Sequence, residues 1–392
     1  MITITISDSK EKDKEEYDNN SEEEEEGEEE GEGEEEEEEE GEEGEEERED
    51  IIMEEEEKKD LLDTCNNMIH NVTNFKNIID MGQFYYDNKK KIKLVLDEES
   101  VDFFRKCYKI KPYVLQLTQM VGLESCKKTI FLQMSYFLQG LHENKLDMLH
   151  MVISGQPGVG KTQLAQIIGK LYSKLGILKY GQFIHAKRSD LIGQHLGETS
   201  IKTSNVIDDA YGGILFIDEA YALGNEEKRD IFSKECIDTI NQALTEQKDS
   251  FMLIIAGYKQ SLLDCFFNYN PGLKRRFNFW IHIPNYNARQ LHQIFVEKFE
   301  LNSDHSEWHI CTPVKRNAPL AFFSKNYNSF KNFGGDIESL IFYIKLFHST
   351  NIKKNKKKKQ ICISDLKGGF ELFKENRQLE NDKNDILNSL YI

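Results

Sequence analysis

The stretch MVISGQPGVGKT, residues 151–162, decides how this chain folds. Its three apolar residues, Met151 to Ile153, predict the end of a buried strand, and the helical pattern QLAQIIGKLY follows the glycine-rich turn. The turn fits the pattern G-x-x-x-x-G-K-[ST], whose fixed places are taken by Gly155, Gly160, Lys161 and Thr162. A glycine-rich turn can arise by chance, but the flanking strand and helix and the Lys-Thr ending favour a phosphate-binding loop.

The residue types in this loop suit triphosphate chemistry. Several backbone N–H groups must meet the phosphate oxygens, and glycine permits conformations and close approaches that a Cβ would block. The following helix presents its free N–H groups and its positive dipole end to the phosphates. Lys161 is predicted to reach the β- and γ-phosphates, and the Thr162 hydroxyl to take one Mg²⁺ position. The predicted nucleotide-binding loop comprises Gly155, Gln156, Pro157, Gly158, Val159, Gly160, Lys161 and Thr162.

A second motif, GGILFIDEAYAL, lies downstream at residues 212–223. The apolar residues Ile214 to Ile217 predict a buried parallel strand that ends in two carboxylates, which is costly unless they meet a cation. The phosphate-bound Mg²⁺ provides that cation. Asp218 is therefore predicted to hold the metal, directly or through water, and Glu219 to orient or deprotonate the attacking water.

Further apolar strands are predicted at 183–186, 251–258 and 279–283, and helical patterns separate them. This alternation predicts an α/β fold, a parallel sheet with helices on both faces, whereas helical patterns dominate from Asn285 onward. The predicted division is a disordered Glu-rich tail over 1–60, a helical extension over 61–113, a P-loop α/β domain over 114–284, a helical lid over 285–375 and a tail over 376–392.

Composition narrows the class of protein. Residues 1–60 hold 34 of the 70 acidic and 6 of the 50 basic residues, a net charge of −28, so the rest of the chain carries +8. The seven cysteines form no C-x-x-C pair, which suits a reducing compartment and disfavours a structural zinc site. No apolar run reaches the ~20 residues that span a bilayer, and the N-terminus does not resemble a signal or transit peptide. We expect an intracellular, cytoplasmic rather than nuclear, protein with no membrane contact.

Two charged segments each have two readings. The Glu-rich tail is either a polyanion that docks on a basic surface or a solubilising segment. The run KKNKKKK, Lys353 to Lys359, is either a nuclear signal or phosphate-binding loop or, as we favour, a solvated loop between the last lid helix and the strand-like QICIS.

The motifs LHMVISGQPGVGKT, DLIGQHLGETSIKT, GGILFIDEAYAL, AGYKQ and NPGLKRRF, in this order, resemble the CbbX/CfxQ group of AAA+ ATPases. That group includes the red-type Rubisco activases and the relatives of stage V sporulation protein K. The resemblance is close over 117–286, weaker to about residue 373 and absent from 1–110. It implies an AAA+ α/β domain with a helical lid, and a ring, hexameric by analogy, that uses ATP and Mg²⁺ to remodel a protein.

The resemblance also assigns residues. It makes Gly155 to Thr162 the Walker A loop and Asp218 with Glu219 Walker B. It makes Arg276 the arginine finger that acts on the neighbouring subunit's site, with Arg275 as the competitor. The remaining assignments are Val121 and Gly122 beside the adenine, Tyr258 at the polar sensor position, and His195, Leu196 and Gly197 on the loop that faces the central pore.

Three positions depart from the family pattern. His195 stands where an aromatic residue, usually Tyr, is expected in the pore loop. Lys274 replaces an arginine at the start of the finger segment. Gly335 and Glu338 lie near the place of the sensor-2 arginines, and Gly334-Gly335-Asp336 is closer to the Gly-Ala-Asp turn of AAA proteins that lack this arginine.

The favoured function is an ATPase that remodels a protein partner. The basic body and the lysine run leave a nucleic-acid-associated ATPase as an alternative, and a third reading is an ATP-binding scaffold without turnover. The sequence does not identify the substrate.

Overall fold

The computed structural model describes residues 53–142, 148–195, 197–224, 230–270, 272–301, 308–311, 318–350 and 359–390. All of these except Met53 and Glu54 fall in one compact unit that begins at Glu55. The Glu-rich tail up to residue 52, the pore-loop residue Leu196 and most of the lysine run, residues 353–358, lie outside the described residues.

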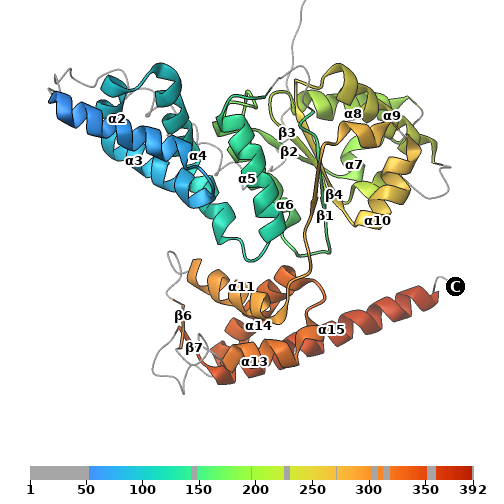
Figure 1. The fold of residues 1–392 in the computed structure, drawn as a ribbon. Helices are drawn as coiled ribbons and strands as arrows, with labels where there is room; N and C mark the ends of the chain where they lie inside the picture. The colour runs from blue at the N-terminus through green and yellow to red at the C-terminus, as the bar shows by residue number, and fades with distance from the viewer. Residues whose placement is uncertain are drawn as a thin grey trace, which may run out of the picture. The chain divides into compact units, whose positions relative to one another are not determined.

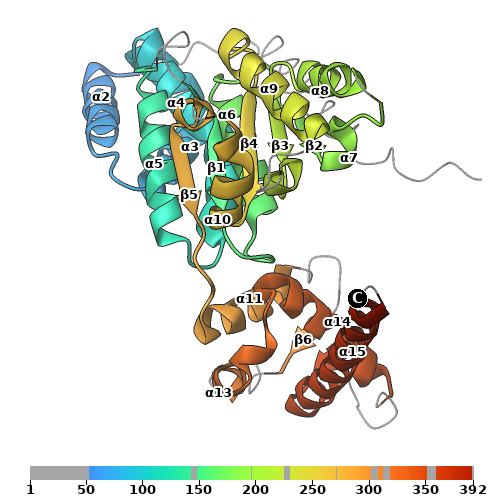
Figure 2. The same cartoon turned by 90° about the vertical axis from the view of Figure 1, so that its right-hand side faces the viewer.

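Five parallel strands form the central sheet in the order β2-β3-β4-β1-β5, which Figure 2 shows from one edge to the other. The strands are β1 (Met151–Ser154), β2 (Phe183–Ala186), β3 (Ile214–Ile217), β4 (Met252–Gly257) and β5 (Phe279–His282). The predicted α/β fold is thereby confirmed. Because β4 alone separates β1 from β3, the loops that follow these two strands emerge side by side at the carboxyl edge of the sheet, where open α/β sheets bind ligands.

Helices cover both faces of the sheet (Figure 1). In β1, Met151 and Ile153 face one hydrophobic cluster, shared with α5 and α6, while Val152 faces the other, shared with α8 and α9. The run of apolar residues in β1 follows from this burial on both sides. The helices and short helical turns of this part are α5 (Glu124–Leu138), α6 (Lys161–Lys174), α7 (Arg188–Leu191), α8 (Glu198–Asp209), η1 (Ala220–Leu223), α9 (Ile231–Glu246), α10 (Lys259–Ser261), η2 (Leu262–Phe266), η3 (Phe267–Tyr269) and η4 (Leu273–Arg276).

Three helices precede the sheet: α2 (Glu55–His70), α3 (Phe75–Val95) and α4 (Glu98–Gln119). Asp97 starts α4 by accepting a hydrogen bond from the Ser100 N–H at 2.7 Å. The predicted boundaries at 60 and 113 fall inside α2 and α4, so the helices run across the predicted divisions. That division of the chain remains a prediction.

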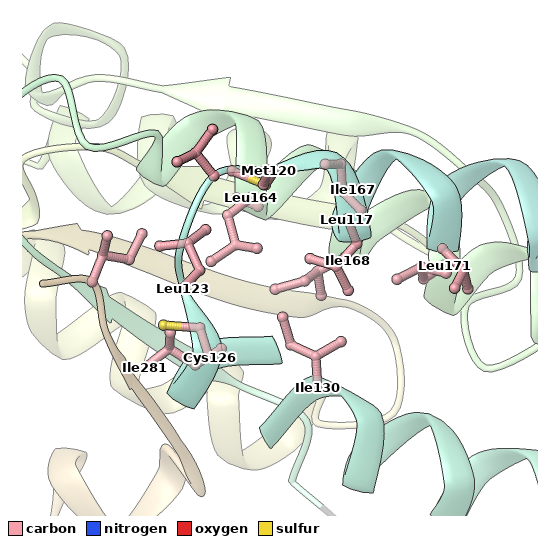
Figure 3. Close-up of a cluster of buried hydrophobic side chains, with 14 of the residues drawn as sticks. Leu117, Met120, Leu123, Cys126, Ile130, Leu164, Ile167, Ile168, Leu171 and Ile281 are labelled. Carbon is pink, nitrogen blue, oxygen red and sulfur yellow. The ribbon is translucent and has the colours of Figure 1, made fainter. Parts of the chain in front are cut away.

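The end of α4 packs onto the helix that follows the P-loop. Figure 3 shows Leu117 and Met120 beside Leu164 and Ile167 of α6, above Leu123 of the turn into α5. Leu123 has φ 64°, a left-handed conformation that costs a non-glycine residue free energy, and its side chain is only 2% exposed. Burial of Leu123 therefore offsets the strain and fixes the Met120–Leu123 turn next to the P-loop.

The remaining elements form a helical lid with a small two-stranded parallel sheet. They are α11 (Ala288–Leu301), β6 (His309–Ile310), α13 (Ala318–Lys325), η5 (Tyr327–Ser329), α14 (Phe333–Thr350), β7 (Gln360–Ile361) and α15 (Ile363–Leu390). Helix α15 continues across the boundary predicted at residue 375. In the described part of the chain, no helix combines the length and the apolar composition needed to cross a membrane.

Candidate nucleotide-binding site

The P-loop connects the end of β1 to the first turn of α6, which begins at Lys161. Gly158 and Gly160 have φ of 70° and 90°, left-handed values that favour glycine. The Lys161 ammonium donates hydrogen bonds to the carbonyls of Gly155 at 3.3 Å and Gln156 at 3.1 Å. Burial lowers the Lys161 pKa, although Asp218 and Glu219 act in the opposite direction. The lysine thus lies between the loop and the two carboxylates.

The two sequence motifs meet at the carboxyl edge of the sheet. The Thr162 hydroxyl donates a hydrogen bond to Asp218 Oδ2 at 3.4 Å, across 56 residues of sequence. Asp218 Oδ1 accepts a hydrogen bond from the Glu219 N–H at 2.9 Å. Glu219 has φ 50°, and backbone strain of this kind in a non-glycine residue clusters at functional sites. This conformation ends β3 and turns the chain into η1.

The donor set fits a magnesium ion. Thr162 and Asp218 present a hydroxyl and a carboxylate oxygen close together, and Mg²⁺ prefers oxygen ligands, keeping waters and substrate phosphates in its other positions. Within the described ranges, no three His, Cys, Asp or Glu side chains gather closely enough to hold a metal alone. A magnesium ion here would therefore depend on phosphate oxygens to complete its shell.

Tyr221 contacts the predicted catalytic glutamate, a contact that the sequence analysis did not foresee. Burial, then the charge and hydrogen bond of Glu219, raise the Tyr221 pKa to about 12, so its hydroxyl stays protonated and can donate to that carboxylate. The ring of Tyr258, the predicted sensor, lies 5.6 Å from the Tyr221 ring, centroid to centroid. The sequence held one clue to this contact, because Tyr221 follows Glu219 by two residues in the motif GGILFIDEAYAL.

A cavity of about 550 Å³ adjoins the P-loop, a volume in the range of small-molecule sites. It is bounded by the end of α4 and the turn that follows it, the P-loop, α6, the start of β2, the second half of α11 and the start of α14. Val121, predicted beside the adenine, lines it, whereas Gly122 is not among the lining residues and lies next to the side chains of Tyr286 and Gln290. The lining of the cavity includes Met120, Val121, Gly158, Gly160, Gln163, Tyr286, Lys298 and Gly334.

The two candidate finger arginines differ in their contacts. Arg276 is half-buried and donates hydrogen bonds to Thr245 Oγ1 at 2.7 and 3.0 Å and to the Gly272 carbonyl at 2.8 Å. Arg275, its neighbour on η4, is exposed. Among the described residues, the hydrogen bonds of Arg276 go to Thr245 and Gly272, and neither arginine lines the cavity beside the P-loop, so the structure does not bring them into the site described above.

The predicted pore segment lies on the connection between α7 and α8, where His195 and Gly197 are exposed and Gly197 has φ 85°. The N–H groups of Gln194 and His195 both donate to Glu198 Oε2, at 3.2 and 3.0 Å. These residues are not part of the nucleotide cavity.

This chain is similar in sequence to a known protein family and to several known proteins. Residues 151–285 match the ATPase family associated with various cellular activities (AAA). The chain is 37% identical over 333 residues to a cfxQ-like protein of Acanthamoeba polyphaga mimivirus, covering 84% of this chain and 78% of that protein. It is 36% identical over 228 residues to stage V sporulation protein K of Bacillus subtilis (strain 168), covering 54% and 70%. It is 35% identical over 179 residues to the chloroplastic ribulose bisphosphate carboxylase/oxygenase activase of Cyanidioschyzon merolae, covering 44% and 61%.

Proposed function

We propose that this chain, which belongs to the cfxQ-like family of AAA ATPases and hydrolyses ATP, works as a ring, hexameric by analogy, that remodels a protein partner. The contact between Thr162 and Asp218 carries the proposal for the site, because it joins the P-loop to the end of β3 in the arrangement that ATP hydrolysis requires.

Each residue of the proposed site has one task in hydrolysis. Lys161 and the loop N–H groups would hold the phosphates, while Thr162 and Asp218 would hold Mg²⁺, which would neutralise charge on the phosphate oxygens. Glu219 accepts a proton from the attacking water, and the Tyr221 hydroxyl orients its carboxylate. Val121 lines the cavity proposed for the base, and Gly122 follows it in the chain.

The remaining positive charge is proposed to come from a neighbouring subunit. Phosphoryl transfer commonly uses an arginine supplied in trans, and the described hydrogen bonds of Arg276 go to Thr245 and Gly272 rather than to the P-loop. Arg276 remains the favoured finger and Arg275 the competitor. The exposure of Arg275 and the cis hydrogen bonds of Arg276 make the choice between them an experimental question.

The experiment is capture of the partner with a Glu219→Gln variant, which should hold ATP and substrate together. The purified variant is measured by light scattering without and with ATP, which gives the size of the assembly. It is then mixed with cell extract and ATP, and the proteins that it retains are identified. Expected are a ring-sized particle with ATP and a protein that is retained with ATP and released with ADP. A particle of monomer mass at all nucleotide concentrations would contradict the ring, and retention of nucleic acid alone would favour the nucleic-acid alternative.

A further inference from the structure

Tyr286 touches the P-loop from outside the Walker motifs. It lies between β5 and α11, only 6% exposed, and its hydroxyl donates a hydrogen bond to the Val159 carbonyl at 2.9 Å. Burial raises the Tyr286 pKa to about 12, so the hydroxyl carries its proton at neutral pH and can donate it. Its ring also packs edge-on against Phe333, the first residue of α14, with centroids 6.2 Å apart.

The lid supplies a second donor to the neighbouring peptide group. The Gly334 N–H, in the first turn of α14, donates to the Gly158 carbonyl at 2.8 Å. A Cβ on Gly158 would lie 1.9 Å from the Asn332 carbonyl oxygen, so only glycine allows the lid to come this close. The need for glycine at position 158 therefore arises from the lid as well as from the phosphates.

These two bonds set the direction of the loop's N–H groups. In a planar trans peptide, the C=O of one residue and the N–H of the next point in opposite directions. Holding the Gly158 carbonyl toward Gly334 therefore turns the Val159 N–H away from the lid. Holding the Val159 carbonyl toward Tyr286 turns the Gly160 N–H away from that tyrosine. Backbone N–H groups of this loop are the ones that cradle phosphates.

We propose that Tyr286 is a positioning residue that, together with the Gly334 N–H, orients two successive peptide groups of the P-loop for nucleotide binding and makes that orientation depend on the lid. The proposal rests on the proposed nucleotide site. It adds a residue outside the Walker motifs, and it links the position of the lid to the backbone orientation of the P-loop.

The link from Tyr286 into the lid is direct. The Tyr327 hydroxyl, in η5, donates to the Tyr286 carbonyl at 2.8 Å. Asp336 also stabilises the turn before α14: its Oδ2 accepts a hydrogen bond from the Asn332 N–H at 2.7 Å, and its carboxylate forms an ion pair with Arg377 of α15. A shift of the lid would therefore move both groups that donate hydrogen bonds to the P-loop, the Tyr286 hydroxyl and the Gly334 N–H.

The test compares Tyr286→Phe with Tyr86→Phe, a change of the same chemistry at an exposed site on α3. Full-length protein is titrated with fluorescent ATP and ADP analogues, and thermal midpoints are recorded with and without nucleotide. Loss of one hydrogen bond predicts about 2- to 10-fold weaker binding of both nucleotides for Tyr286→Phe. We expect a small lowering of the midpoint without nucleotide, because the hydrogen bond to Val159 is already present there, together with a smaller nucleotide-induced rise and wild-type values for Tyr86→Phe.

Two further variants keep the outcomes apart. Tyr327→Phe should weaken nucleotide binding in the same direction but less, because it removes the lid link and leaves the Tyr286 hydroxyl in place. If wild type binds nucleotide, Lys161→Ala does not, and Tyr286→Phe equals wild type in affinity, the positioning proposal is wrong and the site stands. If Tyr286→Phe only lowers the midpoint without nucleotide, its role is structural. If wild type itself fails to bind, both proposals fall.

Discussion

The P-loop and the segment around His195 differ in where their contacts come from. The loop's backbone is bonded to Gly257 on β4 at 3.1 Å and to Tyr286 and Gly334 on the lid side, all distant in sequence. The His195 segment is bonded to Glu198, a few residues away. The fold of this chain therefore fixes the backbone of the P-loop through contacts between distant segments, whereas the hydrogen bonds of the His195 segment to Glu198 are local.

The largest expected effect is the loss of ATP binding when the P-loop lysine is replaced. Lys161→Ala should abolish ATP binding, because it removes the positive charge that lies between the loop carbonyls and the two carboxylates. Equilibrium titration with a fluorescent ATP analogue measures this, and far-UV circular dichroism checks that the variant folds. Wild-type affinity in a folded Lys161→Ala protein would contradict the P-loop assignment.

The arginines test whether the site is complete without a neighbour. Arg276→Ala should leave nucleotide affinity nearly intact and lower turnover by roughly 10³ or more, as loss of an arginine finger does. Mixing it with Lys161→Ala subunits should partly restore turnover, since each mutant supplies what the other lacks.

Arg275→Ala and Thr245→Val are the matched controls for that experiment. If Arg275→Ala shows the large loss and the rescue, the exposed arginine is the finger and Arg276 positions its segment through Thr245. Absence of rescue in a mixture that demonstrably co-assembles would argue for action in cis.

The His195 segment should show effects on coupling instead of turnover. Leu196→Ala is predicted to leave basal ATP hydrolysis largely intact and to uncouple it from remodelling, because an apolar side chain grips a polypeptide better than imidazole does. His195→Tyr should preserve or improve the work. The measurement is remodelling of the captured partner per ATP hydrolysed. Wild-type remodelling by both Leu196→Ala and His195→Ala would exclude threading through the pore.

A smaller effect, on the free energy of unfolding, is expected at Arg188 and Asp230, which attach helix α7, next to the His195 segment, to neighbouring elements. Arg188 of α7 donates to Asp230 at 2.7 Å and to the Ala222 carbonyl at 2.6 Å, joining α7 to α9 and η1. Burial raises the Asp230 pKa, but hydrogen bonds from Ser233 and Arg188 outweigh it and lower the pKa to about 2. A carboxyl whose pKa is lowered on folding stabilises the protein above its unfolded pKa of ~3.9, and this contribution is lost as the pH falls through about 2.

Asp230→Asn keeps a good helix cap and removes the charge. It should lower the free energy of unfolding by about 1 kcal/mol or less at pH 7, with a difference from wild type that shrinks as the pH falls toward 3. Urea denaturation at several pH values measures this, with ATP affinity expected to stay unchanged. A pH-independent difference would show that the ion pair with Arg188 contributes nothing.

The sheet and the pairing of the two Walker motifs could be predicted because their signals are local. Val152 and Leu215 belong to short apolar runs buried on both faces, and the glycines and carboxylates follow those runs directly. Parallel strands then place their carboxyl ends together, which predicts the proximity of Thr162 and Asp218. The tasks of these residues in catalysis remain predictions.

The contacts between distant segments could not be predicted in this way. Tyr286 meets Val159 across 127 residues, and a single tyrosine in NYNARQ has no local signature of that bond. Arg276 meets Thr245 across 31 residues, in a contact that depends on how η4 packs at the end of α9. Such pairs require the positions of whole elements, which hydrophobic periodicity does not fix.

The measurement that tests the central claim most directly is ATP binding and single-turnover hydrolysis by Glu219→Gln, side by side with wild type. Since Glu219 is proposed to act on the attacking water and Lys161 on the phosphates, the variant should bind ATP with wild-type affinity and fail to release phosphate. Turnover close to the wild-type rate would show that Glu219 is not the residue that activates water, and the assignment of the β3 carboxylates would be wrong.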